Sequence, residues 1–218
     1  IQLIAPDNTI LTLSNARGFW IGADPFTRRP YPDAKTEKLR NWFCYRDYSG
    51  DFIVEQDCHN FDVLHWFIGE RPISAVGMGG TFCFKDTKAE IPDTFNVALD
   101  YPGGPTVLLV SSQSNDTPVE HELRGHKATL KFTPTGFTIT PQKMFAKDMQ
   151  PIEYKKRGAE STELHHRNLQ AAIRRNEPLR CDCMLGYYGV VACAMGVESF
   201  RKRKYLAWDK AKERVVRA

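Results

Sequence analysis

The chain has 218 residues, of which 42% are hydrophobic, so it can bury the core of one domain. Its 30 basic and 26 acidic side chains give a formal net charge of +4. Their scatter along the sequence excludes a clustered basic face for nucleic acid, and the apolar content excludes a disordered chain. The sequence has no run of about eighteen apolar residues and no charged start followed by an apolar segment, so we expect no membrane span and no signal peptide.

The first part of the chain predicts a strand, a loop and a short helix. Residues 9–20 mix β-branched and aromatic side chains with period-two polarity, which indicates a strand. Prolines at positions 25, 30 and 32 then interrupt regular structure. Leu39, Trp42 and Phe43 recur at helical spacing, so we expect a helix over residues 34–45.

Residues 49–62 combine ionisable side chains at helical spacing with an apolar run, and they are the most informative part of the sequence. Glu55 and His59 lie four residues apart, so on a helix they share a face and can form a hydrogen bond. A carboxylate keeps an imidazole basic, and histidine, with a reference pKa of about 6.5, can accept a proton from an alcohol near neutral pH. Asp62 could orient the ring or bind a second hydroxyl. The spacing therefore indicates half of an active site.

The same spacing allows a purely structural interpretation. Glu55 and Asp57 would then favour the positive end of a helix, and His59 would be a half-buried residue whose hydrogen bonds are satisfied. We interpret Asp57 as a helix cap rather than a substrate contact. Spacing alone does not separate the catalytic interpretation from the structural one.

Residues 73–141 predict a run of short strands separated by turns. The alternating or β-rich segments are 73–84, 94–101, 106–112, 119–124, 128–133 and 136–140. Glycine and proline between them supply the backbone angles that hairpins require. Because the connections are short, sequential strands should pair antiparallel, and we expect an antiparallel meander.

The end of the chain predicts two helices, over residues 160–204, as the helical part of the same domain. Glu160, Ser161 and Glu163 mark the start of the first helix, and Leu164, Leu169, Ala172 and Ile173 form its apolar face. Asp182 can cap the second helix, whose glycines and alanines leave a surface that permits close packing. We expect residues 1–218 to form one α+β domain, with an open, mainly antiparallel sheet and helices packed on one face.

The six cysteines do not suggest a disulfide scaffold, so we expect reduced and buried thiols. Cys181 and Cys183 are separated by a single residue, whereas paired zinc thiolates usually have two or more residues between them. No second cysteine pair lies at a useful distance. We therefore predict no metal site.

Several motifs together resemble one enzyme family. They are Gly50-Asp51-x-x-x-Glu55-Gln56-x-x-His59-Asn60-x-Asp62, Tyr101-Pro102-Gly103-Gly104, His165-x-x-Asn168-Leu169-x-x-Ala172-Ile173 and Arg203-x-x-x-x-Trp208-Asp209. This set resembles the second domain of the Gfo/Idh/MocA oxidoreductases, with the last motif similar to the close of the bacterial subgroup. The resemblance covers nearly all of the chain from Arg40 onward.

The resemblance implies a two-domain enzyme that transfers hydride to or from a sugar or cyclitol. An N-terminal Rossmann domain would hold NAD or NADP, and this domain would supply the substrate wall and an oligomer interface through its sheet. The sequence has no Gly-x-Gly-x-x-Gly motif between a strand and a helix, because the glycines at 77–80 precede a strand-like run. The chain also begins at Ile1 without an initiator Met. We therefore expect a piece of a longer protein that binds no cofactor by itself.

The sequence departs from the family pattern in three places. Many members carry aspartate where this chain has Glu55 and glycine where it has Asp57. The longer side chain of Glu55 can still reach the imidazole or a sugar hydroxyl. The family's Glu-Lys-Pro motif, whose lysine assists proton transfer, has no counterpart here, so we expect that lysine on the missing domain.

The family pattern and the chemistry of the neighbouring side chains together suggest roles for individual residues. His59 would be the general base and Glu55 its orienting partner, and the candidate substrate-binding residues are Asp62, Asn60, Arg40, Trp42, Tyr45 and His165. Arg40, Trp42 and Tyr45 could equally be ordinary packing residues, since aromatic and arginine side chains serve both roles. We expect His165 to pack against the sheet, with a substrate role left open.

The function predicted from these residues is substrate binding within an NAD(P)-dependent oxidoreductase that acts on a sugar-like molecule. Two alternatives stay open. One is an NAD-dependent glycosidase, which would release free sugar without net reduction of the cofactor. The other is a non-catalytic module that assembles through its sheet. The expected partners are a small sugar-like substrate, the chain's own Rossmann domain and further copies of the chain.

Overall fold

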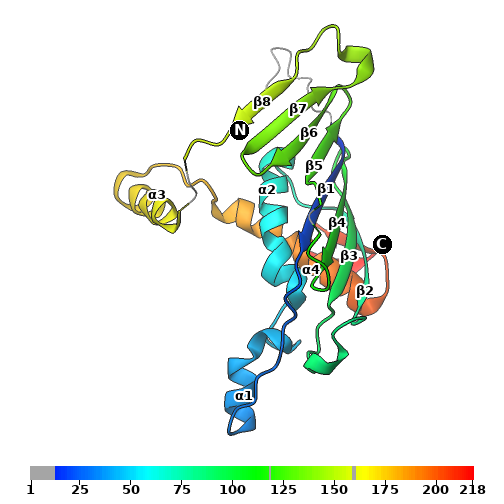
Figure 1. Cartoon of the computed structure of the whole chain (residues 1–218), viewed down its shortest axis with the longest axis vertical. Helices are drawn as coiled ribbons and strands as arrows, with labels where there is room; N and C mark the ends of the chain where they lie inside the picture. Colours follow the sequence, from blue (N-terminus) through cyan, green and yellow to red (C-terminus); the bar gives the residue numbers. More distant parts are fainter. Residues whose placement is uncertain (1–12, 118, 159–160) are drawn as a thin grey trace.

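A ten-stranded sheet forms the body of the molecule, and helices α2 and α4 pack against it (Figure 1). The computed structural model describes residues 13–117, 119–158 and 161–218. The strands are β1 Leu13–Ile21, β2 Ser74–Gly80, β3 Thr94–Asp100, β4 Thr106–Ser112, β5 Glu122–Gly125, β6 Ala128–Thr133, β7 Gly136–Pro141, β8 Ile152–Lys155, β9 Leu206–Asp209 and β10 Arg214–Arg217. The α-helices are α1 Ala34–Arg40, α2 Cys58–Ile68, α3 Thr162–Arg175 and α4 Cys183–Lys202. The first residues of the predicted strand 9–20, and Glu160, lie outside the described residues.

The order of the strands is β10-β9-β2-β3-β4-β1-β5-β6-β7-β8. The predicted α+β class with a mainly antiparallel open sheet is confirmed, but the meander is not continuous. Strand β1 lies between β4 and β5, parallel to β4 and antiparallel to β5. Local turn chemistry cannot reveal this insertion, because β1 pairs with strands about a hundred residues further along the chain.

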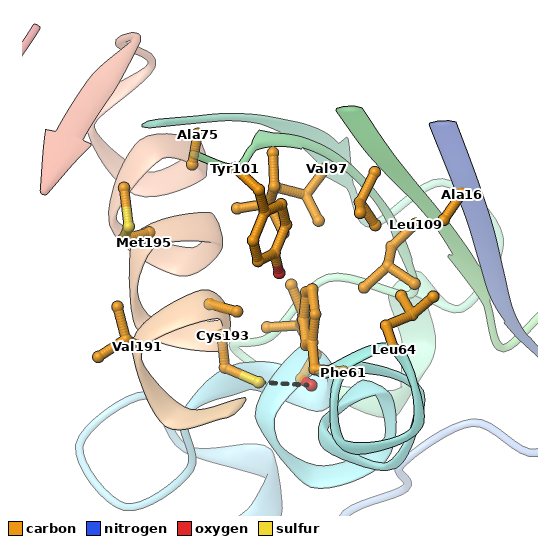
Figure 2. Close-up of a cluster of buried hydrophobic side chains, with 14 of the residues drawn as sticks. Ala16, Phe61, Leu64, Ala75, Val97, Tyr101, Leu109, Val191, Cys193 and Met195 are labelled. Carbon is orange, nitrogen blue, oxygen red and sulfur yellow. Dashed lines mark hydrogen bonds between the residues drawn. The ribbon is translucent and has the colours of Figure 1, made fainter. Parts of the chain in front are cut away.

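The core lies between the inner face of the sheet and helices α2 and α4. Val97, Leu109, Phe61 and Met195 are buried there (Figure 2). The small-residue surface predicted for α4 makes this close packing possible. A Cβ atom placed on Gly77 of β2 would lie 2.7 Å from the carbonyl oxygen of Gly196, which is too close for any side chain.

Helix α4 is long and apolar enough to cross a membrane, judged by length and composition alone, with a mean hydropathy of 1.3. Within the described residues it is the one helix that meets this test. Val191, Ala192, Met195 and Val197 are buried, and the helix packs on β2 and α2. A core helix of a folded domain meets the same test, and α4 has that position here.

Helix α3 stands away from the sheet (Figure 1). Ser161 caps it by accepting a hydrogen bond from the backbone N–H of Leu164. Leu164, Leu169 and Ile173, on the predicted apolar face, are 43%, 47% and 75% exposed. His165 is exposed as well, so the prediction that it packs against the sheet is wrong. The spacing of the apolar residues correctly predicted a helix. It could not show whether another part of the protein covers the apolar face of that helix.

The segment 34–45 is a helix followed by a separate turn. Asp33 caps α1 by accepting from the backbone N–H of Thr36, and the helix ends at Asn41. The Asn41 amide donates to Glu37 and to the carbonyl oxygen of Arg29, which holds the preceding loop against the helix. A 3₁₀ turn, Trp42–Cys44, follows. This segment projects beyond one end of the sheet (Figure 1).

All six thiols are free. Cys44 and Cys193 are buried, and Cys193 donates a weak hydrogen bond to the carbonyl oxygen of Ile53 at 3.7 Å (Figure 2). Cys83, Cys181 and Cys183 are exposed, so the expectation of buried thiols is wrong for these three. Cys83 and Cys181 lie in loops and Cys183 begins α4, outside the packed face of the sheet.

Candidate functional site

The segment that carries the predicted site begins with a π-helical turn, Ile53–Asp57, that leads directly into α2. Its start is fixed by Asp51, which is fully buried, has a φ of 65° and forms an ion pair with Arg201 at the end of α4. A π turn adds a residue to the helical repeat, so side chains before and after it do not keep α-helical spacing. Such turns are frequent at functional sites.

The π turn separates Glu55 from His59. Glu55 is half-buried and accepts a hydrogen bond from the Ser49 hydroxyl at 3.4 Å. His59 is exposed on the first turn of α2. Within the described part of the chain, no hydrogen bond joins the two side chains. The i, i+4 argument assumed an unbroken α-helix, and that assumption fails here.

The outer face of α2 presents His59, Asp62 and Trp66 at spacings of three and four residues. Asp62 is half-buried and accepts a hydrogen bond from the thiol of Cys181 at 3.4 Å. Burial and the nearby Asp62 carboxylate raise the pKa of Cys181 to about 11, so the thiol keeps its proton and remains the donor. This contact brings the connection between α3 and α4 alongside the predicted site.

Asp57 stands at the N-cap position of α2, but its side chain makes no capping hydrogen bond. Its carboxylate is fully buried and accepts hydrogen bonds from the Ser111 hydroxyl, at 2.6 Å to each oxygen, and from the Asn60 amide at 3.2 Å. Burial raises its pKa to about 7, although both hydrogen bonds oppose that rise. The side chain therefore ties the π turn to β4. The position of Asp57 at the start of a predicted helix suggested a cap. Sequence position cannot show whether such a side chain faces solvent or a strand.

Asn60 connects α2 to the sheet. Its amide nitrogen donates to Asp57 and to the carbonyl oxygen of Phe19 in β1, both at 3.2 Å. Both N–H groups of the amide therefore have partners, and its oxygen is left for other contacts. Asn60 also lines a small cavity of about 200 Å³ against Arg17, Gly18 and His121. The structure thus gives Asn60 a positioning role beside its predicted substrate role.

His65 was missed at the sequence level. It lies on the inner face of α2, where its Nε2 is 2.9 Å from the Tyr101 hydroxyl and its Nδ1 has no partner among the described residues. Burial lowers its pKa to about 4, so the ring is neutral at physiological pH. The signal was available, because His65 follows Phe61 and Leu64 at the spacing of the buried face.

A cavity of about 550 Å³ lies beside the second half of α2, and Trp66 in its wall is one helical turn beyond Asp62. Its wall is formed by the second half of α2, the residues that precede α4 and the first turns of α4. The lining residues are His65, Trp66, Leu179, Arg180, Asp182, Met184, Leu185 and Tyr188. Most of these side chains are aromatic or aliphatic, and the few polar groups are of the kind that fix a ligand's orientation.

The structure brings some of the predicted residues together and leaves others apart. His59, Asn60 and Asp62 share the first half of α2, and Glu55 lies just before it. Arg40, Trp42 and Tyr45 belong to the projecting segment around α1 (Figure 1), and His165 is on α3.

Tyr45 has a structural explanation of its own. Its ring is buried, its hydroxyl donates to Glu37, and the Arg28 guanidinium stacks over the ring at 4.5 Å. Arg28 also donates to Glu37 at 2.9 Å, and this ion pair contributes to lowering the pKa of the Glu37 carboxyl. Together these contacts hold the projecting segment in shape. They favour the packing interpretation for Tyr45, whereas Trp42 and Arg40 are exposed.

The sequence matches the family described as "Oxidoreductase family, C-terminal alpha/beta domain" over residues 23–207. A search of curated proteins gives no significant match. The fold, however, resembles many solved structures.

Three of these structures illustrate the range. The aldose-aldose oxidoreductase from Caulobacter crescentus, complexed with glycerol, is 14% identical with a TM-score of 0.66, over 90% of this chain and 56% of that chain. The WlbA dehydrogenase from Bordetella pertussis, in complex with NADH and UDP-GlcNAcA, is 16% identical with a TM-score of 0.63, over 90% and 56%. The NAD-binding protein from Listeria innocua is 12% identical with a TM-score of 0.64, over 89% and 59%.

At these identities the likeness to solved structures concerns the fold, and the chain spans a little over half of the length of each. The family match is stronger, because residues 23–207 make up most of the sequence. The chain therefore belongs to the Gfo/Idh/MocA oxidoreductase family, and it matches the C-terminal alpha/beta domain of that family.

Proposed function

We propose that the chain is the substrate-binding domain of a longer NAD(P)-dependent oxidoreductase that acts on a hydroxyl or carbonyl group of a sugar or cyclitol. The observation that carries the proposal is the outer face of α2, where an exposed His59 and the Asp62 carboxylate lie one turn apart, and Trp66, one turn further along, lines a cavity. The nucleotide sugar and the NADH in the WlbA complex support the substrate and cofactor classes.

In this proposal His59 handles the proton of the reacting hydroxyl. Its exposed ring accepts the proton when the alcohol is oxidised and returns it in the reverse direction. The Asp62 carboxylate accepts a hydrogen bond from a neighbouring hydroxyl and so fixes the orientation of the substrate. Glu55, held by Ser49, adds a carboxylate in the π turn that precedes His59.

The glycines of this chain do not fit a dinucleotide. Gly77 and Gly79 lie within β2, and the backbone N–H of Gly77 is already bound by the Ser199 hydroxyl at 2.8 Å. A diphosphate site needs free N–H groups at the start of a helix, and β2 is followed instead by a loop with a single 3₁₀ turn, Lys85–Thr87, and then by β3. We therefore assign the cofactor to a separate N-terminal domain. The 218-residue chain should bind neither NAD nor NADP in a calorimetric titration, and tight binding would refute this assignment.

The proton-transfer role is tested by substitution of His59 in the full-length parent enzyme. His59→Ala should lower kcat by about a hundredfold or more, the usual size of a general-base effect, with a much smaller change in substrate Kd. His59→Gln is the matched variant, because it keeps a hydrogen-bonding group but cannot take up the proton. Wild-type turnover in either variant would show that another group moves the proton.

We also propose that copies of the chain assemble through the open face of the sheet. Val76 and Met78 of β2 and Leu108 of β4 are 39%, 68% and 38% exposed, on the face opposite the helices. A contiguous apolar sheet face of this kind is typical of a protein interface. Met78→Glu should lower the molar mass measured by light scattering toward that of the monomer. Met144→Glu, at an exposed methionine outside the sheet, should leave it unchanged.

A further inference from the structure

We infer that the cavity beside α2 is a second subsite, which binds an anionic sugar unit linked to the unit that reacts at His59. This inference rests on the proposed function, because it takes His59 as the reacting end of the site. It narrows the substrate class from sugars in general to glycosides that carry a carboxylate or phosphate group on the unit away from the reacting hydroxyl.

The position of the cavity indicates a substrate longer than one ring. Trp66 lies in the cavity wall, seven residues after His59 on the same face of α2. At 1.5 Å per residue, this separation is about 10 Å along the helix axis, more than a single sugar ring spans. The Cys181 contact with Asp62 lies along this route and brings the residues before α4 against the helix. Two linked sugar units would fit from His59 to Trp66.

The lining is suited to a sugar ring. Trp66 is 44% exposed, and Tyr188 is half-buried in the same wall. Flat aromatic rings with one accessible side can stack on the apolar C–H face of a sugar. The volume of about 550 Å³ lies within the range of roughly 300–1,000 Å³ that is usual for small-molecule sites. Leu179 and Met184, 40% and 48% exposed, add apolar surface at the rim.

Arg180 supplies the charge that selects an anion. Its backbone N–H is bound by Asn168, which fixes the main chain at this point, while its guanidinium has no ion pair within the described ranges. The carboxylate of Asp182 is already used, because it accepts from the backbone N–H groups of Met184 and Leu185 at the start of α4. Arg180 is therefore free to bind a carboxylate or phosphate with two parallel hydrogen bonds.

His65 provides an unused polar atom in the same wall. Its Nε2 is bonded to Tyr101, and its Nδ1 is buried without a partner among the described residues. A buried polar group without a hydrogen bond destabilises a fold, and such groups in folded proteins call for a water molecule or a ligand. This Nδ1 is buried too deeply to meet a ligand in the cavity, so the recognition rests on aromatic stacking and the anion contact.

The test measures the binding of saccharides to the 218-residue chain. Binding is monitored by fluorescence titration and by NMR. The probes are cellobiose, its uronic acid form (glucuronosyl-glucose), cellobiose 6′-phosphate and free glucuronic acid. We expect one or both acidic disaccharides to bind at least about tenfold more tightly than cellobiose, and more tightly than free glucuronic acid. A preference for only one of the two acids identifies the anionic group. Equal binding of cellobiose and both acids, or no detectable binding, would overturn the inference.

Substitutions then assign the preference to the cavity. Arg180→Gln should remove the advantage of the acidic disaccharides, whereas Arg174→Gln, at an exposed arginine on α3 outside the cavity, should preserve it. Trp66→Leu should weaken binding of all disaccharides by about tenfold, and Phe82→Leu, at an exposed ring after β2, should not. Retention of the acid preference in Arg180→Gln would refute the subsite. Because no turnover is measured, that result would leave the role of His59 intact.

Discussion

Asp57 should make the domain less stable as the pH rises from about 4 to about 7. Burial raises its pKa in the folded chain from 3.8 to about 7. Between these two values the unfolded chain has released the proton of Asp57, while the folded chain still holds it. The folded state therefore binds more protons, and the free energy of unfolding falls as the pH increases. Above pH 7 the carboxylate is ionised in both states and the contribution is constant.

The size of the effect follows from the two pKa values. A difference of about three pKa units corresponds to about 4 kcal/mol, at 1.36 kcal/mol per unit, between the two ends of the pH window. Asp57→Asn removes this dependence. An asparagine has nearly the same shape, and it can still form hydrogen bonds with Ser111 and Asn60. Relative to the wild type, the variant should gain about 4 kcal/mol of stability between pH 4 and pH 8.

The assay is urea unfolding, followed by circular dichroism, of the wild type and Asp57→Asn at pH 4, 5.5, 7 and 8. The decisive quantity is the difference in unfolding free energy between the two proteins at each pH, because other groups contribute to both. Asp24→Asn, at an exposed aspartate, is the control and should show a nearly constant difference. A constant difference for Asp57→Asn as well would refute the reasoning, since it would mean that burial does not hold the proton on this carboxyl.

Two further changes test the packing that positions the site. Gly196→Ala should destabilise the fold by about 1–3 kcal/mol, because the added Cβ would lie 3.0 Å from the Ile53 side chain. The effect is measured as a lower midpoint of urea unfolding. An unchanged midpoint would show that α4 can move away from Ile53. Arg201→Gln should lower the free energy of unfolding by about 3 kcal/mol or more, since it leaves the buried Asp51 carboxylate unpaired. Adding Asp51→Asn to that variant should restore most of the lost stability, because no buried charge then remains.

Much of the sheet could be predicted because its signals are local. Strands β4 and β6 were predicted at their observed bounds, Thr106–Ser112 and Ala128–Thr133, where alternating side chains are enclosed by turn residues. The place of β1 could not be predicted, since it depends on pairing with distant strands. The exposed apolar face of α3 was equally hidden, because periodicity identifies a face but not what covers it.

The helix that carries the candidate residues was predictable from the sequence, but the contacts among these residues were not. The spacing of His59 and Asp62 correctly placed both on one face of α2. It could not show that a π turn precedes them, because a π turn depends on an extra residue accommodated by tertiary packing. Nor could it show that Asp57 faces β4. Its burial depends on Ser111, a strand residue far along the chain.

Asn60 is the residue at which positioning and substrate binding can be separated. Its amide joins Asp57 to the carbonyl oxygen of Phe19, so it links the π turn, α2 and β1. Asn60→Ala should destabilise the domain by about 1–3 kcal/mol, because it removes a donor to the Phe19 carbonyl oxygen and one of the two donors to the buried Asp57 carboxylate. The same change removes a hydrogen bond that lowers the pKa of Asp57, so the pH at which stability levels off should move upward.

A residue that only contacted substrate would leave both the unfolding free energy and that pH unchanged in the absence of ligand. Urea unfolding of Asn60→Ala across the same pH series therefore distinguishes the two roles without any substrate. The pH shift must also disappear when Asp57 is already asparagine, because no titrating carboxyl remains. If the shift persisted in the double variant, another buried group would be responsible. If it vanished, the shift would belong to Asp57 and to the hydrogen bond that it accepts from Asn60.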